Sequence, residues 1–181
     1  MDDKKIYKLL QDWFPELNCK KVPKESQRRD FQNFKAWMVT EKNGRQARSY
    51  LMSLHPAQPL RHSLGHSAVL QDMRLDLEKA HLEMEQAAQP TLRNYEQHKA
   101  EIGKNYSVQE QVAEIVLSEI CALLRQCGCR MLLIYADQYY WIAVPEHAEK
   151  VNKFCKKFEK QFKADEVRIE LFSISDCLKS T

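Results

Sequence analysis

The sequence of 181 residues predicts an α+β protein, in which a mainly helical region over residues 1–105 precedes a compact α-β-β-α-β subdomain over residues 106–181. Three observations lead to this prediction. Apolar side chains recur every three or four residues through much of the chain, which is typical of amphipathic helices. Two short apolar runs, over residues 130–135 and 139–144, are typical of buried strands. Apolar and polar residues then alternate over residues 167–174, as they do in a half-buried strand.

The N-terminal region begins with a short amphipathic helix and a basic loop. Apolar residues at helical spacing over residues 3–14 predict the helix, and Pro15 ends it one residue later. From Asn18 to Arg29 the chain is polar and basic, with Pro23 in the middle. This composition indicates a loop with a cationic face.

Residues 31–54 fit two different structures. The aromatic residues of this segment are spaced for one face of a helix, and two helices would then meet at Gly44. Strand-like segments also flank Asn43 and Gly44, and both of these residues tolerate the positive φ angles of the type I′ turn that closes a hairpin. We favour a β-hairpin near residues 34–54, and the helical alternative stays open.

A long helix is predicted over residues 67–88, because apolar residues alternate there at spacings of three and four until Pro90 interrupts the pattern. The seam consists of Leu70, Met73, Leu77, Ala80, Met84 and Ala87. Packing against helices of the same chain explains it, and a homodimer through this helix is the alternative. A weaker helical stripe continues to Gly103, where a Gly-Lys-Asn turn marks the boundary with the second subdomain.

The second subdomain is predicted from local signals. Ser107 indicates the start of a helix over residues 108–126, and Gly128 indicates its end. A tight turn at residues 136–138 separates the two apolar strands, and a helix over residues 145–164 precedes the final strand. Strands that are apolar throughout are buried on both faces, so helices are expected on each side of the sheet.

Positive charge is concentrated in the first third of the chain. The net charge of +3 does not by itself imply nucleic-acid binding, but residues 1–66 contain 13 basic and 7 acidic side chains. Aromatic residues are interleaved with this basic segment, and they would stack on bases while the cations contact phosphates. The candidate binding residues are Lys20, Lys21, Lys24, Arg28, Arg29, Lys35, Arg45, Arg48 and Trp37.

These features favour a non-enzymatic binding or adaptor protein, which engages another protein or a nucleic acid through its basic N-terminal third. A weaker lysine stripe lies on the predicted C-terminal helix, where Glu149 and Glu159 balance part of its charge. It comprises Lys150, Lys153, Lys156, Lys157, Lys160 and Lys163. No stretch approaches the roughly 20 apolar residues that cross a bilayer, so a cytoplasmic protein without a membrane partner is expected.

No catalytic, metal or cofactor site is predicted from common motifs. Four glycines leave little room for a phosphate-binding loop, and the sequence contains neither a nucleophile elbow nor a zinc-protease motif. Cys127 and Cys129 lack the spacing of a zinc finger, and the six cysteines are expected to be reduced and mostly buried. We therefore expect no metal and no cofactor.

The segment over residues 61–66 contains an arginine, a polar residue next to it and a histidine five positions after the arginine. This order resembles the short signature of HEPN-type ribonucleases. The resemblance implies metal-independent RNA cleavage in an all-helical dimer, in which Arg61 would stabilise the phosphate and His66 would transfer protons. A guanidinium suits the developing phosphorane charge, and an imidazole titrates near neutral pH. A ribonuclease that uses Arg61 and His66 is therefore the alternative function.

The α-β-β-α-β order of the second subdomain is similar to the core of PD-(D/E)xK nucleases. In that comparison Asp137 stands where the family keeps its first metal carboxylate. The next strand would have to supply an acidic residue, a spacer and a lysine, but it reads Trp-Ile-Ala-Val-Pro from Trp141. Any such fold here is therefore expected to be non-catalytic.

Overall fold

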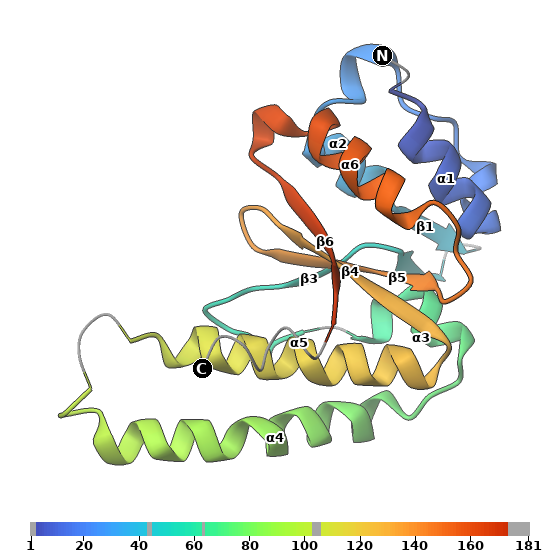
Figure 1. Cartoon of the computed structure of the whole chain (residues 1–181). Coiled ribbons are helices and arrows are strands. Elements are labelled where there is room, and N and C mark those ends of the chain that lie inside the picture. The colour runs from blue at the N-terminus through green and yellow to red at the C-terminus, as the bar shows by residue number, and fades with distance from the viewer. Residues whose placement is uncertain (1–2, 43–44, 63, 103–105, 174–181) are drawn as a thin grey trace.

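The α+β fold predicted from the sequence is confirmed by the computed structural model, which describes residues 3–42, 45–62, 64–102 and 106–173. Helices pack on both faces of a four-stranded antiparallel sheet with the strand order β3-β5-β4-β6 (Figure 1). The strands are β3 (Met52–Leu54), β4 (Cys129–Tyr135), β5 (Tyr139–Pro145) and β6 (Arg168–Phe172). A separate two-stranded sheet pairs β1 (Val39–Lys42) with β2 (Arg45–Ser49).

The centre of the sheet is the predicted hairpin of β4 and β5. Its register places Leu133 opposite Trp141, and the turn closes with a hydrogen bond from the Ala136 amide to the Gln138 carbonyl (3.1 Å). The inner residues of both strands are buried, because helices cover the two faces of the sheet. Burial on both faces explains why β4 and β5 are continuous apolar runs in the sequence.

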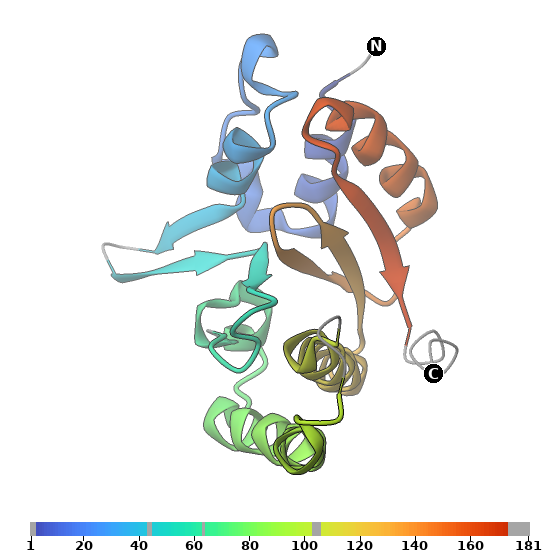
Figure 2. The ribbon, with the colours of Figure 1, turned by 90° about the vertical axis from the view of Figure 1, so that its left-hand side faces the viewer.

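One face of the sheet is covered by α5 (Val108–Gln126), and α4 (Leu77–His98) packs against α5 as an outer layer (Figures 1 and 2). The Ser107 side chain caps α5 as predicted, since it accepts a hydrogen bond from the Glu110 amide. The core on this side contains Met131, Leu133 and Trp141 from the sheet.

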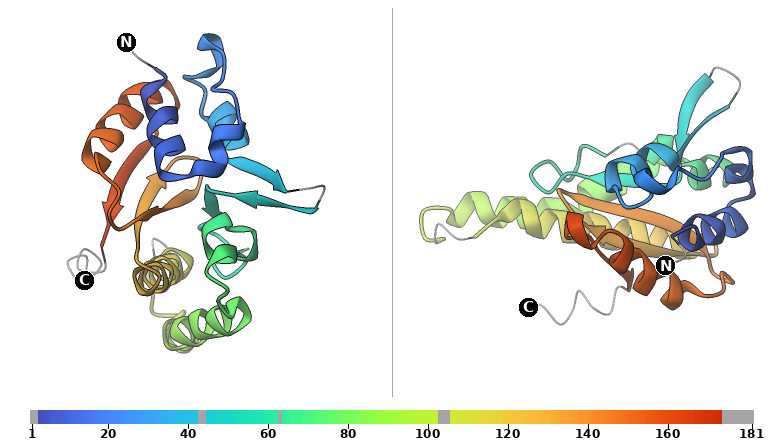
Figure 3. Two further views of the ribbon diagram at one scale, coloured as in Figure 1. Left: turned by 90° about the vertical axis from the view of Figure 1, so that its right-hand side faces the viewer. Right: turned by 90° about the horizontal axis from the view of Figure 1, so that it is seen from above.

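The opposite face is covered by α1 (Lys5–Trp13), α2 (Phe31–Trp37) and α6 (Val151–Gln161), as Figure 3 shows from two sides. Aromatic rings fill the space between these helices and the sheet, with Phe34 lying 5.2 Å from Phe158 and 5.3 Å from Phe162 between ring centroids. Helix α6 is shorter than the predicted helix over residues 145–164, because Pro145 ends β5 and the chain turns before Val151.

Residues 31–54 contain both a helix and a hairpin. The Asp30 side chain caps α2, since it accepts hydrogen bonds from the Gln32 and Asn33 amides, and β1 and β2 form the antiparallel hairpin only after this helix ends. The predicted type I′ turn at residues 43–44 lies outside the described residues. The segment then contributes β3 to the main sheet, where it pairs with β5.

The prediction of one helix over residues 67–88 is wrong. The chain forms α3 (Ala68–Asp72) and α4 instead, because Arg74 adopts a left-handed backbone (φ 52°) and the Asp76 side chain starts a new helix by accepting a hydrogen bond from the Lys79 amide. The prediction that Pro90 interrupts the helix is also wrong. Pro90 lies inside α4 at an exposed position, where water can solvate the carbonyl that loses its amide donor.

Four 3-10 helices complete the described structure, namely η1 (Pro15–Cys19), η2 (Glu25–Gln27), η3 (Leu64–His66) and η4 (Lys163–Asp165). The first two form part of the basic loop that sequence analysis placed after α1. Of the helices in the described residues, none has the length and apolar character that crossing a bilayer requires.

Candidate functional site

Several of the predicted basic residues hold the loop between α1 and α2 in place. The Lys20 ammonium donates to the backbone carbonyls of Ala36 and Val39, and the Arg28 guanidinium donates to the carbonyl of Pro23 (2.8 Å). The Trp37 indole, which is 5% exposed, donates to the carbonyl of Lys21 (3.1 Å). These side chains therefore stabilise the fold at this position, and the Trp37 ring is not accessible for stacking.

Two further predicted cations have acidic partners. The Arg29 guanidinium lies 3.1 Å from the carboxylate of the buried Asp3. The Lys35 ammonium donates to the Tyr140 hydroxyl (2.8 Å), lies 3.7 Å from Asp137 and sits over the Phe31 ring at 5.5 Å from its centroid. Lys35 thus ties α2 to the turn between β4 and β5.

Arg48 is a buried ion-pair residue at the base of the hairpin. Its side chain is 7% exposed, and its guanidinium lies 2.7 Å from the Asp72 carboxylate and 3.6 Å from Glu16. It also donates to the carbonyl of Ala68 (3.1 Å). The hydrogen bond to Asp72 raises the pKa of Arg48, so this guanidinium stays charged and is engaged inside the protein.

Of the three remaining predicted residues, two are at the surface in the described part of the chain. Lys21 and Lys24 are exposed, whereas the side chain of Arg45 lies outside the described part of the chain. The exposed large hydrophobic residues of the described chain are Val39, Met73, Leu82 and Leu171, and they include no aromatic ring. The rings interleaved with the basic segment, Phe31, Phe34, Trp37 and Tyr50, are buried, so they cannot stack on bases as the sequence suggested.

A larger basic surface is formed by α1 and α6, which come from opposite ends of the chain. The two helices are in contact and lie side by side over the same face of the sheet (Figures 2 and 3). Each helix buries its apolar stripe toward the sheet and exposes lysines on its other side. We call this surface the lysine face, and it comprises the exposed Lys4, Lys5, Lys8, Lys153, Lys156 and Lys160 together with the half-buried Lys157.

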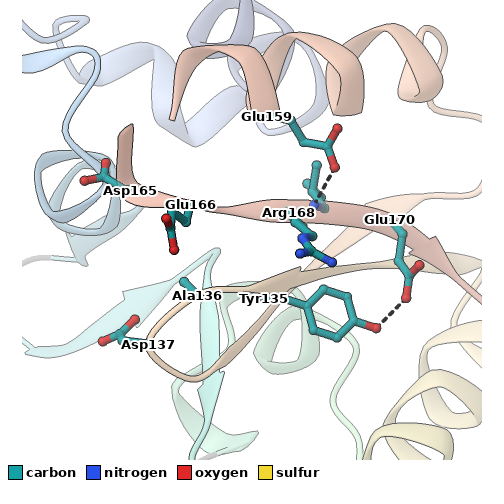
Figure 4. A pocket seen from close by; sticks show the side chains of 9 residues that line it. Tyr135, Ala136, Asp137, Glu159, Asp165, Glu166, Arg168 and Glu170 are labelled. Atoms are coloured by element: carbon teal, nitrogen blue, oxygen red, sulfur yellow. Dashed lines mark hydrogen bonds between the residues drawn. The ribbon is translucent and has the colours of Figure 1, made fainter. Parts of the chain in front are cut away.

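The helices α1 and α6 each contain one acidic residue. Asp12 is exposed on α1, and Glu159 is exposed on α6. The Glu159 carboxylate accepts a hydrogen bond from the Ile169 amide of β6 (3.2 Å), so it points away from the lysines toward the sheet (Figure 4). The spacing of lysines in the sequence indicates the α6 stripe alone. The contribution of α1 was missed, because the contact between α1 and α6 joins residues too far apart in the chain for spacing to indicate it.

A cavity of about 650 Å³ between the end of α6, the start of β6 and the β4–β5 turn is lined mainly by acidic side chains (Figure 4). Two of its carboxylates accept hydrogen bonds that join elements of the fold. Asp165 accepts a hydrogen bond from the Phe31 amide (3.0 Å), and Glu170 accepts one from the Tyr135 hydroxyl. In the described ranges no three histidine, cysteine or acidic side chains are grouped in a way that could hold a metal ion.

Asp137, the residue that the nuclease comparison placed at a metal, accepts a hydrogen bond from the Tyr140 hydroxyl (2.9 Å). It lies on the rim of the acidic cavity, and its other carboxylate oxygen faces Lys35. Its carboxylate therefore helps to fix the β4–β5 turn.

Arg61 and His66, the pair of the ribonuclease alternative, lie in an exposed connection between β3 and α3. Arg61 donates to the Gln58 side chain (3.3 Å), and His66 ends η3. No hydrogen bond joins the two among the described residues. The α+β fold also differs from the all-helical fold that the HEPN resemblance implies.

Comparison of the chain with protein-family models, curated proteins and solved structures finds no match. Function is therefore inferred from the geometry and chemistry of the described residues alone.

Proposed function

We propose that this chain is a non-enzymatic binding protein that contacts the phosphate backbone of a nucleic-acid duplex through the lysine face. One observation carries the proposal: α1 and α6 are in contact over the same face of the sheet, and each carries exposed lysines beside an apolar stripe that is buried in the same core. Lysines that are exposed and near one another can neutralise several phosphates at once, and the release of condensed counterions then drives binding.

The composition of the lysine face favours backbone contact over base recognition. Lysine is a compact point charge on a flexible stem, which suits phosphate oxygens without fixing a particular geometry. The rings interleaved with the basic segment, Phe31, Phe34, Trp37 and Tyr50, are buried, so they offer unpaired bases no stacking platform. We therefore expect binding that depends little on sequence and that does not prefer single strands.

The acidic residues beyond α6 would limit where the duplex lies. Asp165 and Glu166 follow the helix and line the acidic cavity. Their negative charge would repel phosphates from the region beyond the C-terminal end of α6. The duplex is thereby directed across α1 and α6 rather than along the sheet edge at β6.

The proposal is tested with two charge-reversal variants that carry the same change in net charge. The first replaces Lys153, Lys156 and Lys160 by Glu on the lysine face. The matched control replaces Lys79 and Arg93 of α4, and Lys99 directly after it, by Glu; α4 lies on the opposite side of the sheet. Binding to a short fluorescent duplex is measured by anisotropy between about 50 and about 200 mM salt.

The wild type and the α4 control should bind with affinities that fall steeply with salt, and the α6 variant should lose about three units of the logarithmic salt slope. Equal loss in both variants, or no binding by the wild type, would contradict the proposal. If the wild type binds polyglutamate but does not bind the duplex, the partner of the lysine face is an acidic protein instead.

A further inference from the structure

The segment of residues 55–62 follows β3 and lies against α4. It contains turns but no helix or strand. The hydrogen bonds described for this segment join its own residues to one another: the Gln58 amide donates to the His55 carbonyl (3.0 Å), and the Arg61 amide donates to the Gln58 carbonyl (2.9 Å). Side-chain packing therefore holds the 55–62 segment against the rest of the protein.

Pro59, Leu60 and His62 contribute to this packing. Pro59 is buried, and Leu60 is half-buried against the core that contains Met84 of α4. The His62 ring lies 4.8 Å from the His81 ring of α4 between centroids, and the two planes are inclined at 68°. The edge of one imidazole thus meets the face of the other, which is a favourable contact for uncharged rings.

The position of His62 suits a neutral imidazole only. Both of its ring nitrogens are buried without a hydrogen-bond partner in the described structure. Protonation would therefore bury a positive charge together with two N–H donors that have no acceptor, which costs more than burying the neutral ring. Water satisfies both donors as soon as the ring leaves α4.

The charged groups that reach His62 in the described structure lie on α4. His81 is in ring contact, and the Glu85 carboxylate lies 3.2 Å from the His81 imidazole. Burial and His81 lower the pKa of His62 to about 4, and Glu85 offsets only part of this decrease. The neighbouring Arg61 and His66 are exposed. The surroundings of His62 therefore oppose its protonation as long as the segment stays in place.

We propose that the 55–62 segment acts as a pH-sensitive latch, in which mild acid protonates His62 and detaches the segment from α4 while the sheet and its other helices stay folded. The change is local, because the described hydrogen bonds of the segment are internal and none of them has to break for the segment to leave α4. Detachment exposes the surface of α4 around His81 and the part of the core that Leu60 covers.

The pH range of the latch follows from the difference between its two states. The pKa of His62 is about 4 while the segment is attached, and it returns to its ordinary value of 6.5 when the ring is in water. The attached state is therefore fully favoured above about pH 6.5, and it loses stability as the pH falls toward about 4. Between about pH 7 and about pH 5 the detached population should rise roughly twentyfold.

Limited proteolysis of the full chain tests the proposal. Trypsin cleaves after Arg61, inside the segment, and cleavage of a native protein follows the population of the open form. The rate is divided by that of a free peptide with the sequence of residues 55–67 at the same pH, which removes the effect of pH on trypsin. This relative rate should be about twentyfold higher at about pH 5 than at about pH 7. Equal relative rates at the two pH values would overturn the proposal.

Cleavage after Arg130 separates local detachment from unfolding of the whole protein. Arg130 lies within β4, where it is opposite Val144 of β5, so trypsin reaches it only when the sheet unfolds. Relative to matched peptides, cleavage after Arg61 should be much faster than cleavage after Arg130 at both pH values. Similar rates at the two sites would mean that the segment opens only with the whole fold, which contradicts the latch.

Matched variants identify the group that responds to pH. His62→Phe keeps an aromatic ring against His81 but cannot be protonated, so its relative rate at Arg61 should not change with pH. His66→Phe, at an exposed histidine, should respond as the wild type does. A full response in His62→Phe would assign the effect to another group and contradict the proposal.

NMR titration of the wild type gives a second measurement that does not depend on the folding of a variant. The pKa of His62 should be about 4 in the protein and close to 6.5 in the free peptide. The same pKa in both would show that the attached segment does not oppose protonation, and the latch would then have no driving force.

Discussion

The guanidinium of Arg48 lies 2.7 Å from the carboxylate of Asp72, and this pair joins the base of the β1–β2 hairpin to α3. Arg48 resembles a surface cation in the sequence, yet only 7% of its side chain is exposed. Its function in the fold can be separated from binding by experiment.

We expect Arg48→Met to lower the free energy of unfolding by about 1–3 kcal/mol, because charged hydrogen bonds to Asp72 and the Ala68 carbonyl are lost. Affinity for the duplex should stay within about twofold of the wild type, since this guanidinium does not reach the lysine face. Lys156→Met should show the reverse pattern, with weaker binding and unchanged stability. Urea denaturation and anisotropy measure the two quantities, and loss of binding in Arg48→Met would place Arg48 in the binding surface after all.

The aromatic core under α6 should be the most sensitive part of the fold to truncation. Phe158 is fully buried, and its ring centroid lies 5.2 Å from that of Phe34 and 4.8 Å from that of Phe162. Phe158→Ala should lower the free energy of unfolding by about 3–5 kcal/mol, because it leaves a cavity among these rings. Leu82→Ala, at a side chain that is 52% exposed, should change it by less than about 0.5 kcal/mol. Similar losses in both variants would contradict this packing.

His62 should make the fold less stable in mild acid. Its ring lies 4.8 Å from that of His81, and both of its ring nitrogens are buried without a hydrogen-bond partner in the described structure. Burial and the neighbouring His81, which pairs with Glu85, lower the pKa of His62 from 6.5 to about 4. Between about pH 6.5 and about pH 4, the His62 imidazole is protonated in the unfolded chain but neutral in the native protein. The free energy of unfolding therefore falls as the pH drops through this range.

Urea denaturation at about pH 7 and about pH 5 measures this effect. His62→Phe should lose less stability between the two pH values than the wild type, because the buried imidazole is gone. His66→Phe, at an exposed histidine, should behave as the wild type does. An equal decrease in all three proteins would exclude His62 as the cause.

The ribonuclease alternative makes a different prediction for His66. Incubation of the purified chain with RNA in the presence of a chelator should give no cleavage, because Arg61 bonds to Gln58 and the two candidate residues have no mutual contact in the described residues. Cleavage by the wild type that disappears in His66→Ala would support the ribonuclease and would count against a purely binding function.

The elements that were predicted well are those with strong local signals. Helix α5 and the strands β4 and β5 follow from a Ser cap, a Gly stop and two continuous apolar runs, each of which is a property of neighbouring residues. The break before α4 also had a local signal, since Asp76 is a favourable N-cap, but the apolar seam of the segment concealed it.

The elements that were missed depend on contacts between distant residues. The pairing of β3 with β5 and the burial of Arg48 arise from tertiary packing, and an arginine that pairs inside the protein has the same local sequence pattern as one in solvent. The candidate surface was predicted as a contiguous basic segment for the same reason. Folding divides that segment among structural hydrogen bonds and leaves a different set of lysines together on α1 and α6.

The packing of α1 against α6 also affects how the chain can fold during synthesis. At about 5–20 residues per second, the ribosome makes α1 of the order of ten seconds before α6 is complete. During this interval α2 can already pack on α1, because Tyr7 contacts Phe34 and Trp37 of that helix, but the surface of α1 that meets α6 lacks its native neighbour. The contact between α1 and α6 therefore forms late, and the part of α1 that it covers stays accessible to solvent or to a chaperone until α6 has been made.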